Sequence, residues 1–210
     1  MQGVGGCAIT AMCGTGARAQ ADGHMIRILA LGDSLTAGYG LARSDGFVAQ
    51  LERALRAKGI PARVIDAGVS GDTTAGGRAR LEWALAERPH VAIVALGGND
   101  GLRGLDPAST HANLSAILSR LRERNIPALL AGMLAPPNLG AEYGEAFRNT
   151  YAQLAREYEV VFYPFFLEGV AAEPALNQPD GIHPNARGVA VMVERILPSV
   201  EQLLARAPRG

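Results

Sequence analysis

The chain has 210 residues, which suits one domain, and 48% of these residues are hydrophobic. Lysine and arginine together number 20, as do aspartate and glutamate, so the formal net charge is zero. A neutral chain offers no basic face for a polyphosphate backbone, which argues against a nucleic acid partner. Glycine is in surplus, with 26 residues, and it is favoured in loops that need unusual backbone angles or a close approach to a ligand.

The first 25 residues differ in character from the rest. Residues 1–17 carry no charged side chain, and Ala17-Arg18-Ala19 resembles a signal-peptidase cleavage site, although the usual basic start is missing. We therefore expect a leader or arm over 1–25 and a periplasmic or secreted protein, with a cytoplasmic location as the alternative. Both cysteines, Cys7 and Cys13, lie in this leader, so the expected core uses no disulfide and no cysteine-metal site.

From Ile26 onward, short apolar runs alternate with amphipathic stretches. The apolar runs predict strands: they cover 26–31, 62–66, 91–96, 127–132 and 159–163. The amphipathic stretches predict helices: they cover 45–58, 73–87, 107–124, 141–157 and 185–204. Alternation without a linker predicts one α/β domain over 26–210, a three-layer α/β/α flavodoxin-like sandwich around a five-stranded parallel sheet. No stretch reaches the roughly 20 apolar residues that span a bilayer, so stable membrane insertion is not expected.

Several residues predict where these helices begin and end. Asp45, Thr73 and the pair Asp106-Pro107 are typical of helix starts, because their side chains accept hydrogen bonds from free N–H groups of the first turn. Gly59 is placed to close the first helix. Pro198 is expected to kink or end the last helix, because proline cannot donate a backbone hydrogen bond.

Glycine-rich segments follow the first three predicted strands, at 32–40, 68–73 and 97–104. Right-handed crossovers bring such loops to one edge of a parallel sheet, where ligands bind. A fourth segment, 180–184, precedes the last helix and places a histidine three residues after an aspartate. Together the segments supply a serine hydroxyl, an imidazole, a carboxylate and accessible backbone N–H groups. Serine hydrolases need this set for the nucleophile, its base, the group that orients the base, and the oxyanion hole.

Four blocks in this order resemble the SGNH (GDSL) hydrolases: Gly32-Asp33-Ser34-Leu35, Gly71, Gly97-Gly98-Asn99-Asp100 and Asp180-x-x-His183. The longer strings at 98–104 and 180–185 are similar to the branch of multifunctional thioesterases, lysophospholipases and arylesterases often called acyl-CoA thioesterase I. The resemblance implies the SGNH hydrolase fold, no cofactor and no metal. It also implies a small-molecule substrate, a short- to medium-chain ester or acyl thioester. We expect a monomer or a weak homo-oligomer.

The resemblance also implies a role for each matched residue. Ser34 would be the nucleophile, His183 the general base and then acid, and Asp180 the carboxylate that orients His183. The oxyanion hole would combine the backbone N–H groups of Ser34 and Gly71 with the side-chain amide of Asn99. Loop 134–144 stands where this branch lines its acyl pocket. The predicted substrate-binding residues are Leu35, Leu102, Pro136 and Ile182.

Other interpretations of the same segments stay open from the sequence. Ser70 is a rival nucleophile, because residues 68–71 match part of the G-x-S-x-G elbow, although Asp72 breaks the pattern. A divalent-metal phosphohydrolase is a second possibility, and a surface carbohydrate- or lipid-binding module is a third. We expect local turn hydrogen bonds from Asp33, Asp72 and Asp100. The four aspartates that could hold a metal are Asp33, Asp72, Asp100 and Asp180.

Overall fold

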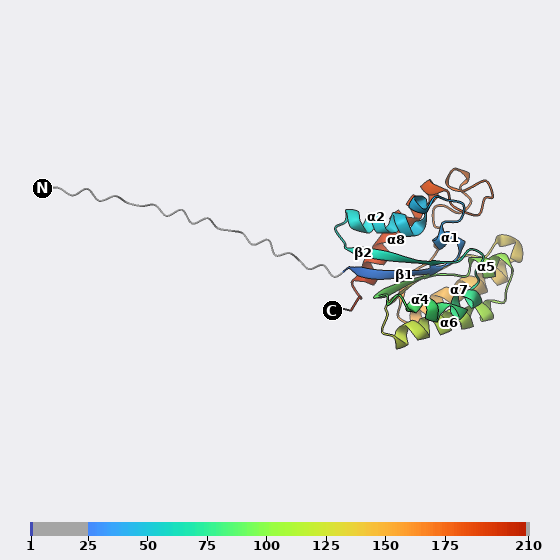
Figure 1. The fold of residues 1–210 in the computed structure, drawn as a ribbon. Coiled ribbons are helices and arrows are strands. Elements are labelled where there is room, and N and C mark those ends of the chain that lie inside the picture. The colour runs from blue at the N-terminus through green and yellow to red at the C-terminus, as the bar shows by residue number, and fades with distance from the viewer. Residues whose placement is uncertain (2–24, 209–210) are drawn as a thin grey trace.

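Five parallel strands form the centre of the computed structural model, which describes Met1 and residues 25–208 (Figure 1). Their order across the sheet is β2-β1-β3-β4-β5. This is the predicted fold class, whereas the leader with Cys7 and Cys13 lies outside the described residues except for Met1 and Met25. The strands are β1 (Ile26–Gly32), β2 (Ala62–Gly68), β3 (Val91–Ala95), β4 (Ala128–Ala131) and β5 (Val161–Tyr163).

Helices cover both faces of the sheet and so complete the three layers. In Figure 1, α2 and α8 lie on one face, and α4, α6 and α7 lie on the other. The helices are α1 (Ser34–Ala37), α2 (Phe47–Ala57), α3 (Thr74–Ala79), α4 (Leu81–Leu85), α5 (Gly98–Leu102), α6 (Pro107–Glu123), α7 (Ala141–Glu157) and α8 (Ala186–Leu204). Three 3₁₀ turns are η1 (Arg43–Asp45), η2 (Pro137–Leu139) and η3 (Pro174–Leu176). Within the described residues, no helix combines the length and apolarity needed to cross a membrane.

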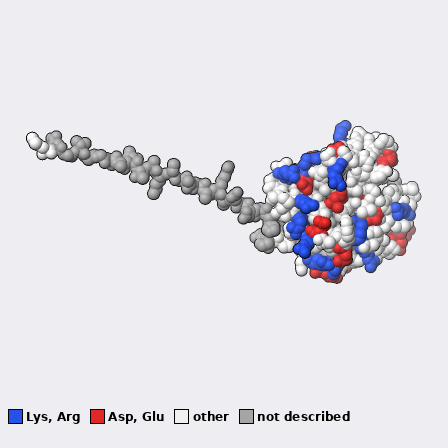
Figure 2. All heavy atoms as spheres, viewed as in Figure 1, with Lys and Arg blue, Asp and Glu red and all other residues white. Residues whose placement is uncertain are grey.

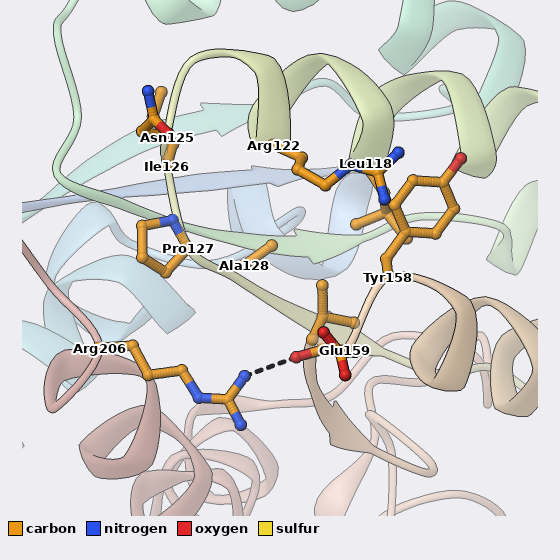
Figure 3. Close-up of a pocket in the computed structure, with 10 residues that line it drawn as sticks. Leu118, Arg122, Asn125, Ile126, Pro127, Ala128, Tyr158, Glu159 and Arg206 are labelled. Atoms are coloured by element: carbon orange, nitrogen blue, oxygen red, sulfur yellow. Dashed lines mark hydrogen bonds between the residues drawn. The ribbon is translucent and has the colours of Figure 1, made fainter.

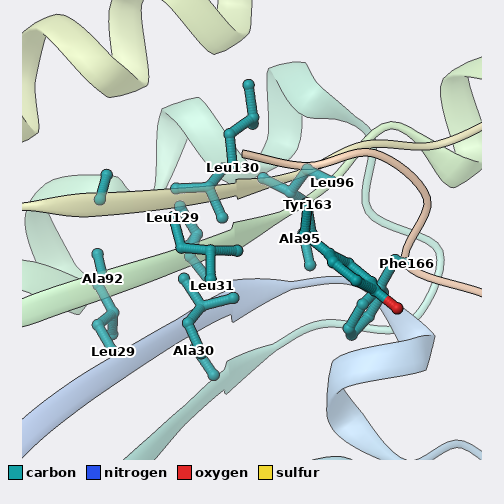
Figure 4. Packing of buried hydrophobic residues seen from close by; sticks show 14 of the residues in the cluster. Leu29, Ala30, Leu31, Ala92, Ala95, Leu96, Leu129, Leu130, Tyr163 and Phe166 are labelled. Carbon is teal, nitrogen blue, oxygen red and sulfur yellow. The ribbon is translucent and has the colours of Figure 1, made fainter. Parts of the chain in front are cut away.

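The core lies on both faces of the sheet because the central strands carry apolar side chains on both faces, with Arg27 at the start of β1 as the exception. Leu29 and Leu31 of β1 and Leu129 and Leu130 of β4 are fully buried. Figure 4 shows these residues packed with their neighbours from β3, and with the ring of Phe166 beyond β5. A strand buried on both faces reads as a continuous apolar run, which is why the sequence pattern located these strands.

The ends of β1 and β2 carry glycines because α1 packs directly on them. Gly32 pairs in register with Gly68 of β2 and Ala95 of β3, so the three following loops start side by side. A β-carbon on Gly68 would run into the backbone of Ala37, and one on Gly32 would run into the side chain of Thr36. Close packing of α1 therefore needs glycine at both strand ends.

Most of the predicted helix ends are confirmed. Thr73 caps α3 by accepting from the Gly76 N–H, and Asp106 caps α6 by accepting from the Ala108 N–H, with Pro107 as the first helical residue. Gly59 follows the end of α2 in the left-handed region, with φ of +74°.

Two predicted helix features are wrong, and of the two alternatives predicted for Pro198, a kink or a helix end, the second is wrong. Asp45 lies in η1 and does not cap α2, which begins after Gly46; the start of α2 is instead held by Gln50, whose amide donates to the carbonyls of Asp45 and Ala186. The helix predicted over 73–87 is two short helices, because the chain breaks at Arg80. Pro198 does not end α8, which continues to Leu204 because its apolar face stays packed on the core, with Val200 and Leu203 fully buried.

Candidate active site

Ser34 stands at the first position of α1, directly after the end of β1. The preceding residue, Asp33, caps this helical turn by accepting from the Leu35 N–H at 3.0 Å. The N–H of the first helical residue has no acceptor within the helix, so the Ser34 N–H is available to a ligand. Ser34 is 9% exposed, so its hydroxyl faces a sheltered space at the carboxyl edge of the sheet.

His183 and Asp180 lie in line with this hydroxyl. The His183 Nε2 is 2.9 Å from the Ser34 Oγ, and the His183 Nδ1 is 2.7 Å from the Asp180 Oδ2. The second carboxylate oxygen of Asp180 accepts from the backbone N–H groups of Ile182 and His183, at 3.0 Å each. The loop before α8 thus holds the carboxylate and the imidazole in one unit, and it presents that unit to α1 across 149 residues of sequence.

The carboxylate of Asp180 determines the tautomer of the neutral His183 ring. The backbone N–H of His183, its imidazole and the backbone N–H of Ile182 hold the pKa of Asp180 at about 2, below its usual range. An ionised carboxylate only accepts hydrogen bonds, so the proton of the neutral imidazole lies on Nδ1. The Nε2 lone pair is then free to accept the proton of the Ser34 hydroxyl.

Two residues that support His183 were missed by the sequence analysis. The ring of Tyr39 lies against the His183 ring, with 4.6 Å between ring centroids and 40° between the planes. Gln178 ties the two loops together: its amide donates to the carbonyls of Tyr39 and Pro184, and its backbone N–H donates to the His183 carbonyl at 2.7 Å. Tyr39 falls inside the first glycine-rich segment, but no motif in the sequence points to Gln178.

The loop after β2 forms a tight turn around Gly71. The Asp72 N–H donates to the Val69 carbonyl at 3.0 Å, and Gly71 has φ of +84°, as the third residue of such a turn requires. This hydrogen bond uses the Asp72 N–H and leaves that of Gly71 for other partners. Arg103 steadies the turn by donating to the Gly71 carbonyl at 2.9 Å. Ser70, the rival nucleophile, is exposed in this turn, whereas the His183 Nε2 is bonded to Ser34.

Asn99 joins this turn to the nucleophile. Its side-chain amide, on α5, donates to the Asp72 carbonyl at 2.8 Å and lies 3.4 Å from a carboxylate oxygen of Asp33. Asn99 and Ser34 line the same cavity, whereas Gly71 is not among the residues of its wall. The structure therefore gathers the three predicted oxyanion donors on neighbouring loops of one sheet edge.

The strand-end aspartates hold these loops in place. Asp72 pairs with Arg80, with 2.6 Å between its Oδ2 and the Arg80 Nε. Asp100 is buried and accepts from the N–H and hydroxyl of Thr74 and from the hydroxyl of Thr110. The expected local turn bond is found for Asp33 and is wrong for Asp72 and Asp100, because donors from distant segments bind these two carboxylates instead. Within the described residues, no group of three His, Cys, Asp or Glu side chains is arranged to hold a metal ion.

Asp33 gives the site a second carboxyl group with an unusual protonation. Burial raises its pKa to about 6, against the lowering effect of the Leu35 N–H bond and of His183. The folded protein therefore holds the Asp33 proton over a pH range in which the unfolded chain has released it. Because the folded state binds more protons there, the free energy of unfolding falls as pH rises from about 4 to about 6. A pKa shift of this size changes the free energy of unfolding by about 3 kcal/mol across that pH range.

We expect Asp33→Asn to remove this part of the pH dependence. The free energy of unfolding of the wild type, measured in urea, should fall between pH 4 and pH 7. In the variant this fall should be smaller by about 3 kcal/mol. Asp66→Asn is the matched control, because Asp66 is exposed and accepts from the N–H two residues ahead, as Asp33 does. The control should keep the wild-type pH profile. A wild-type profile in Asp33→Asn would show that the carboxyl of Asp33 titrates normally.

An apolar cavity of about 500 Å³ opens beside the Ser34 hydroxyl, and His183 also lines it. Its walls come from α1, α5, the loop between β4 and α7, and the segment after β5. Leu102 and Ile182 stand at its exposed rim, about half accessible. All four predicted substrate-binding residues line this cavity: Leu35, Leu102, Pro136 and Ile182. Further apolar lining comes from Met133, Leu134, Phe165 and Leu167.

A second hollow, of about 380 Å³, lies at the opposite edge of the sheet, before β4 and β5 (Figure 3). Its wall includes Arg122, whose guanidinium stacks 4.8 Å from the Tyr158 ring centroid. Arg206 donates to the Glu159 carbonyl at 2.7 Å, as Figure 3 shows. None of the predicted site residues lines this hollow, so the chemistry described above belongs to the carboxyl edge alone.

Acidic and basic side chains are interspersed on the face shown in Figure 2. Several are paired: Glu82 binds both Arg120 and Arg124 through its two carboxylate oxygens, and Lys58 binds Glu201. Interspersed charge on this face is in keeping with the zero net charge of the sequence.

Comparisons with known proteins find esterases and thioesterases that are similar to this chain. Esterase TesA of Pseudomonas aeruginosa is 42% identical over 178 residues, which cover 84% of this chain and 89% of that protein. Thioesterase 1/protease 1/lysophospholipase L1 of Escherichia coli (strain K12) is 43% identical over 159 residues, 75% of each chain. The crystal structure of AlinE4, described as an SGNH-hydrolase family esterase, superposes with a TM-score of 0.73 at 52% identity, covering 87% of this chain and 98% of that one.

The family model for the GDSL-like lipase/acylhydrolase family matches residues 30–191. This range spans all four sequence blocks, from the segment around Ser34 to His183. With the sheet order, the serine–histidine–aspartate line and these relatives in agreement, the chain belongs to the GDSL-like lipase/acylhydrolase family.

Proposed function

We propose that this protein is a serine hydrolase that cleaves short- to medium-chain carboxylic esters and acyl thioesters through an acyl-enzyme on Ser34. The observation that carries the proposal is the unbroken line from the Ser34 Oγ through both nitrogens of His183 to the Asp180 carboxylate, with distances of 2.9 and 2.7 Å, at the wall of an apolar cavity. The names of the relatives, esterase, thioesterase and lysophospholipase among them, support the same reaction class.

The first half of the reaction forms the acyl-enzyme. The Ser34 Oγ attacks the substrate carbonyl carbon as the His183 Nε2 takes the hydroxyl proton, and the Asp180 carboxylate stabilises the resulting imidazolium. The carbonyl oxygen becomes an oxyanion, which the N–H groups of Ser34 and Gly71 and the Asn99 amide would bind. The intermediate collapses when His183 gives its proton to the departing alkoxide or thiolate. Ser34 keeps the acyl group.

The second half repeats these steps with water as the nucleophile. His183 takes a proton from water, and the hydroxide attacks the acyl carbonyl. His183 then gives its proton to the Ser34 Oγ, which restores the Ser34 hydroxyl as the carboxylic acid leaves. The triad acts only on the acyl carbonyl, so oxyesters and thioesters enter the same cycle. The apolar cavity beside Ser34 suits an acyl chain, because each buried CH₂ contributes about 0.8 kcal/mol of binding free energy.

The proposal is tested by comparing inhibitors on p-nitrophenyl butyrate. We expect a serine-directed alkyl phosphonate to abolish hydrolysis and to add its mass to the peptide that contains Ser34, while EDTA leaves the rate unchanged. A series of p-nitrophenyl esters and acyl-CoA thioesters with matched chain lengths then measures cavity depth and leaving-group preference. The opposite pattern, inactivation by EDTA and resistance to the phosphonate, would contradict the proposal and favour the metal-dependent alternative.

Asn99→Ala is expected to lower kcat by roughly 10²–10³, the usual loss for one oxyanion donor. KM for p-nitrophenyl butyrate should change little, because the donor acts on the transition state more than on the bound ester. Asn113→Ala provides the control: Asn113 is also half-buried, but its amide donates to Thr74 on the α3–α6 side and does not line the cavity. Wild-type kcat in Asn99→Ala would remove Asn99 from the oxyanion hole.

A further inference from the structure

The chain breaks between α3 and α4 at Arg80, and the side chain of this residue turns back onto the catalytic edge of the sheet. Its guanidinium makes three separate hydrogen bonds: Nε to the Asp72 Oδ2 at 2.6 Å, Nη1 to the Ala67 carbonyl at 2.8 Å, and Nη2 to the Gly32 carbonyl at 2.8 Å. The Arg80 side chain is only 17% exposed. A guanidinium offers donors in a fixed planar fork, so these three acceptors are held at fixed relative positions.

Each acceptor borders the proposed catalytic site. The Gly32 carbonyl ends β1, immediately before Asp33 and the nucleophile Ser34. The Ala67 carbonyl lies near the end of β2, at the root of the turn that contains Gly71. The Asp72 carboxylate belongs to that same turn, one residue after Gly71. One cation thus joins the segment that carries the Ser34 N–H to the segment that carries the Gly71 N–H.

Asp72 also contacts the third predicted oxyanion donor, the side-chain amide of Asn99. Arg80 holds its carboxylate from one side, while the Asn99 amide donates to its backbone carbonyl at 2.8 Å from the other. The carboxylate also lies directly against Gly76 of α3, where a β-carbon would collide with it. A shift of Asp72 would therefore move the Gly71 N–H and the Asn99 amide together, away from the Ser34 N–H.

We propose that Arg80 is a positioning residue that sets the spacing of the oxyanion hole, an inference that rests on the proposed serine hydrolase function. Oxyanion donors act only when they are held within about half an ångström of the productive geometry. Arg80 does not line the cavity beside Ser34; it acts through Gly32, Ala67 and Asp72. A merely structural ion pair between Arg80 and Asp72 would affect stability, whereas a positioning role lowers kcat at an unchanged KM.

The test compares Arg80→Lys and Arg80→Gln with the wild type on p-nitrophenyl butyrate. Lysine keeps the charge but cannot supply three donors in one plane, so we expect kcat to fall by about 10–100-fold with KM within about 2-fold. Arg78→Lys and Arg78→Gln are the controls: Arg78 lies at the end of α3, two residues before Arg80, is exposed and, within the described residues, bonds the Asn113 side chain alone, and both variants should keep wild-type kcat. Thermal unfolding checks that every variant is folded at the assay temperature.

A double-mutant cycle with Asn99→Ala separates positioning from bulk stability. With the Asn99 amide removed, Arg80→Lys has less of the oxyanion hole to disturb, and its further cost should shrink to about 3-fold or less. Equal, multiplicative losses in both backgrounds would overturn the proposal, as would wild-type kcat in folded Arg80→Lys. If neither Arg80 variant folds, Asp72→Asn replaces them: it weakens the same contact, and wild-type kcat there overturns the proposal.

The outcomes also distinguish this inference from the proposed function. Ester hydrolysis that persists in Ser34→Ala would contradict the serine hydrolase itself, whatever the Arg80 variants do. Hydrolysis that depends on Ser34 but not on the Arg80 guanidinium would contradict only the positioning role.

Discussion

Ser34→Ala is expected to lower kcat for p-nitrophenyl butyrate by about 10⁴–10⁶, the scale seen when a triad nucleophile is removed. The Ser34 Oγ lies 2.9 Å from the His183 Nε2, and alanine fits the same space without a nucleophile. The residual rate reflects what the oxyanion hole and substrate binding achieve alone. Steady-state kinetics measure the change, and an unchanged thermal unfolding temperature shows that the fold survives.

Two companion variants define what this result means. Ser70→Ala removes the rival nucleophile, which is exposed in the turn around Gly71, and it should retain nearly the wild-type rate. The double variant Ser34→Ala/His183→Ala should be no slower than Ser34→Ala, because the two residues act as one unit. A large loss in Ser70→Ala together with a small loss in Ser34→Ala would assign the nucleophile to Ser70.

The parts of the fold that the sequence predicts are those with local physical causes. Strand β3 is buried along its whole length and β1 is buried from Ile28 onward, so each appears as an apolar run, which in β1 only Arg27 interrupts. Thr73 and Asp106 cap helices through bonds to N–H groups two or three residues ahead, and such contacts follow from local sequence alone. The glycines at the ends of β1 and β2 mark where α1 packs closely, and they direct attention to the correct edge of the sheet.

The features that could not be predicted from the sequence depend on contacts between distant segments. The break at Arg80 is tied to strand ends 13 and 48 residues away, which no helical pattern encodes. Asp100 looks like a turn residue but is a buried acceptor for Thr74 and Thr110 on two other elements. Gln178 reaches across 139 residues to the Tyr39 carbonyl. In each case a polar side chain has partners that are distant in sequence and that only the folded chain brings near.

The candidate site itself was predictable because its chemistry limits the choice of residue types. A serine, a histidine three residues after an aspartate, and glycine-flanked donors occur together on the predicted sheet edge, and the four blocks resemble one family. The structure places the five predicted triad and oxyanion residues at one edge of the sheet, although their roles stay predictions. The supporting groups, Tyr39, Gln178 and Arg80, act through other residues, and their types are common on any surface.

Asp180→Asn is expected to lower kcat by about 10³–10⁴ at neutral pH, although asparagine has nearly the same shape. An asparagine oxygen can still accept from the Ile182 and His183 N–H groups, so the loop should persist. Its NH₂ group would then face the His183 Nδ1, which must become an acceptor and place the ring proton on Nε2. The imidazole in that tautomer cannot take the proton of the Ser34 hydroxyl, and the loss should appear in kcat.

The same substitution should change stability in acid with a definite sign. The pKa of Asp180 is lowered to about 2 by its bonds to His183 and Ile182, so the unfolded chain binds the proton first as pH falls. The carboxylate therefore stabilises the fold above about pH 4, and this contribution is lost as pH falls toward 2. Urea unfolding across this range should show a smaller loss of unfolding free energy in acid for Asp180→Asn than for the wild type.

The kinetic control for Asp180→Asn is Asp106→Asn, which keeps a helix-capping oxygen far from His183 and should retain wild-type kcat. If Asp180→Asn also retains wild-type kcat, the orientation of His183 must come from another group, and the ring of Tyr39 and the Gln178 bonds are the contacts placed to supply it.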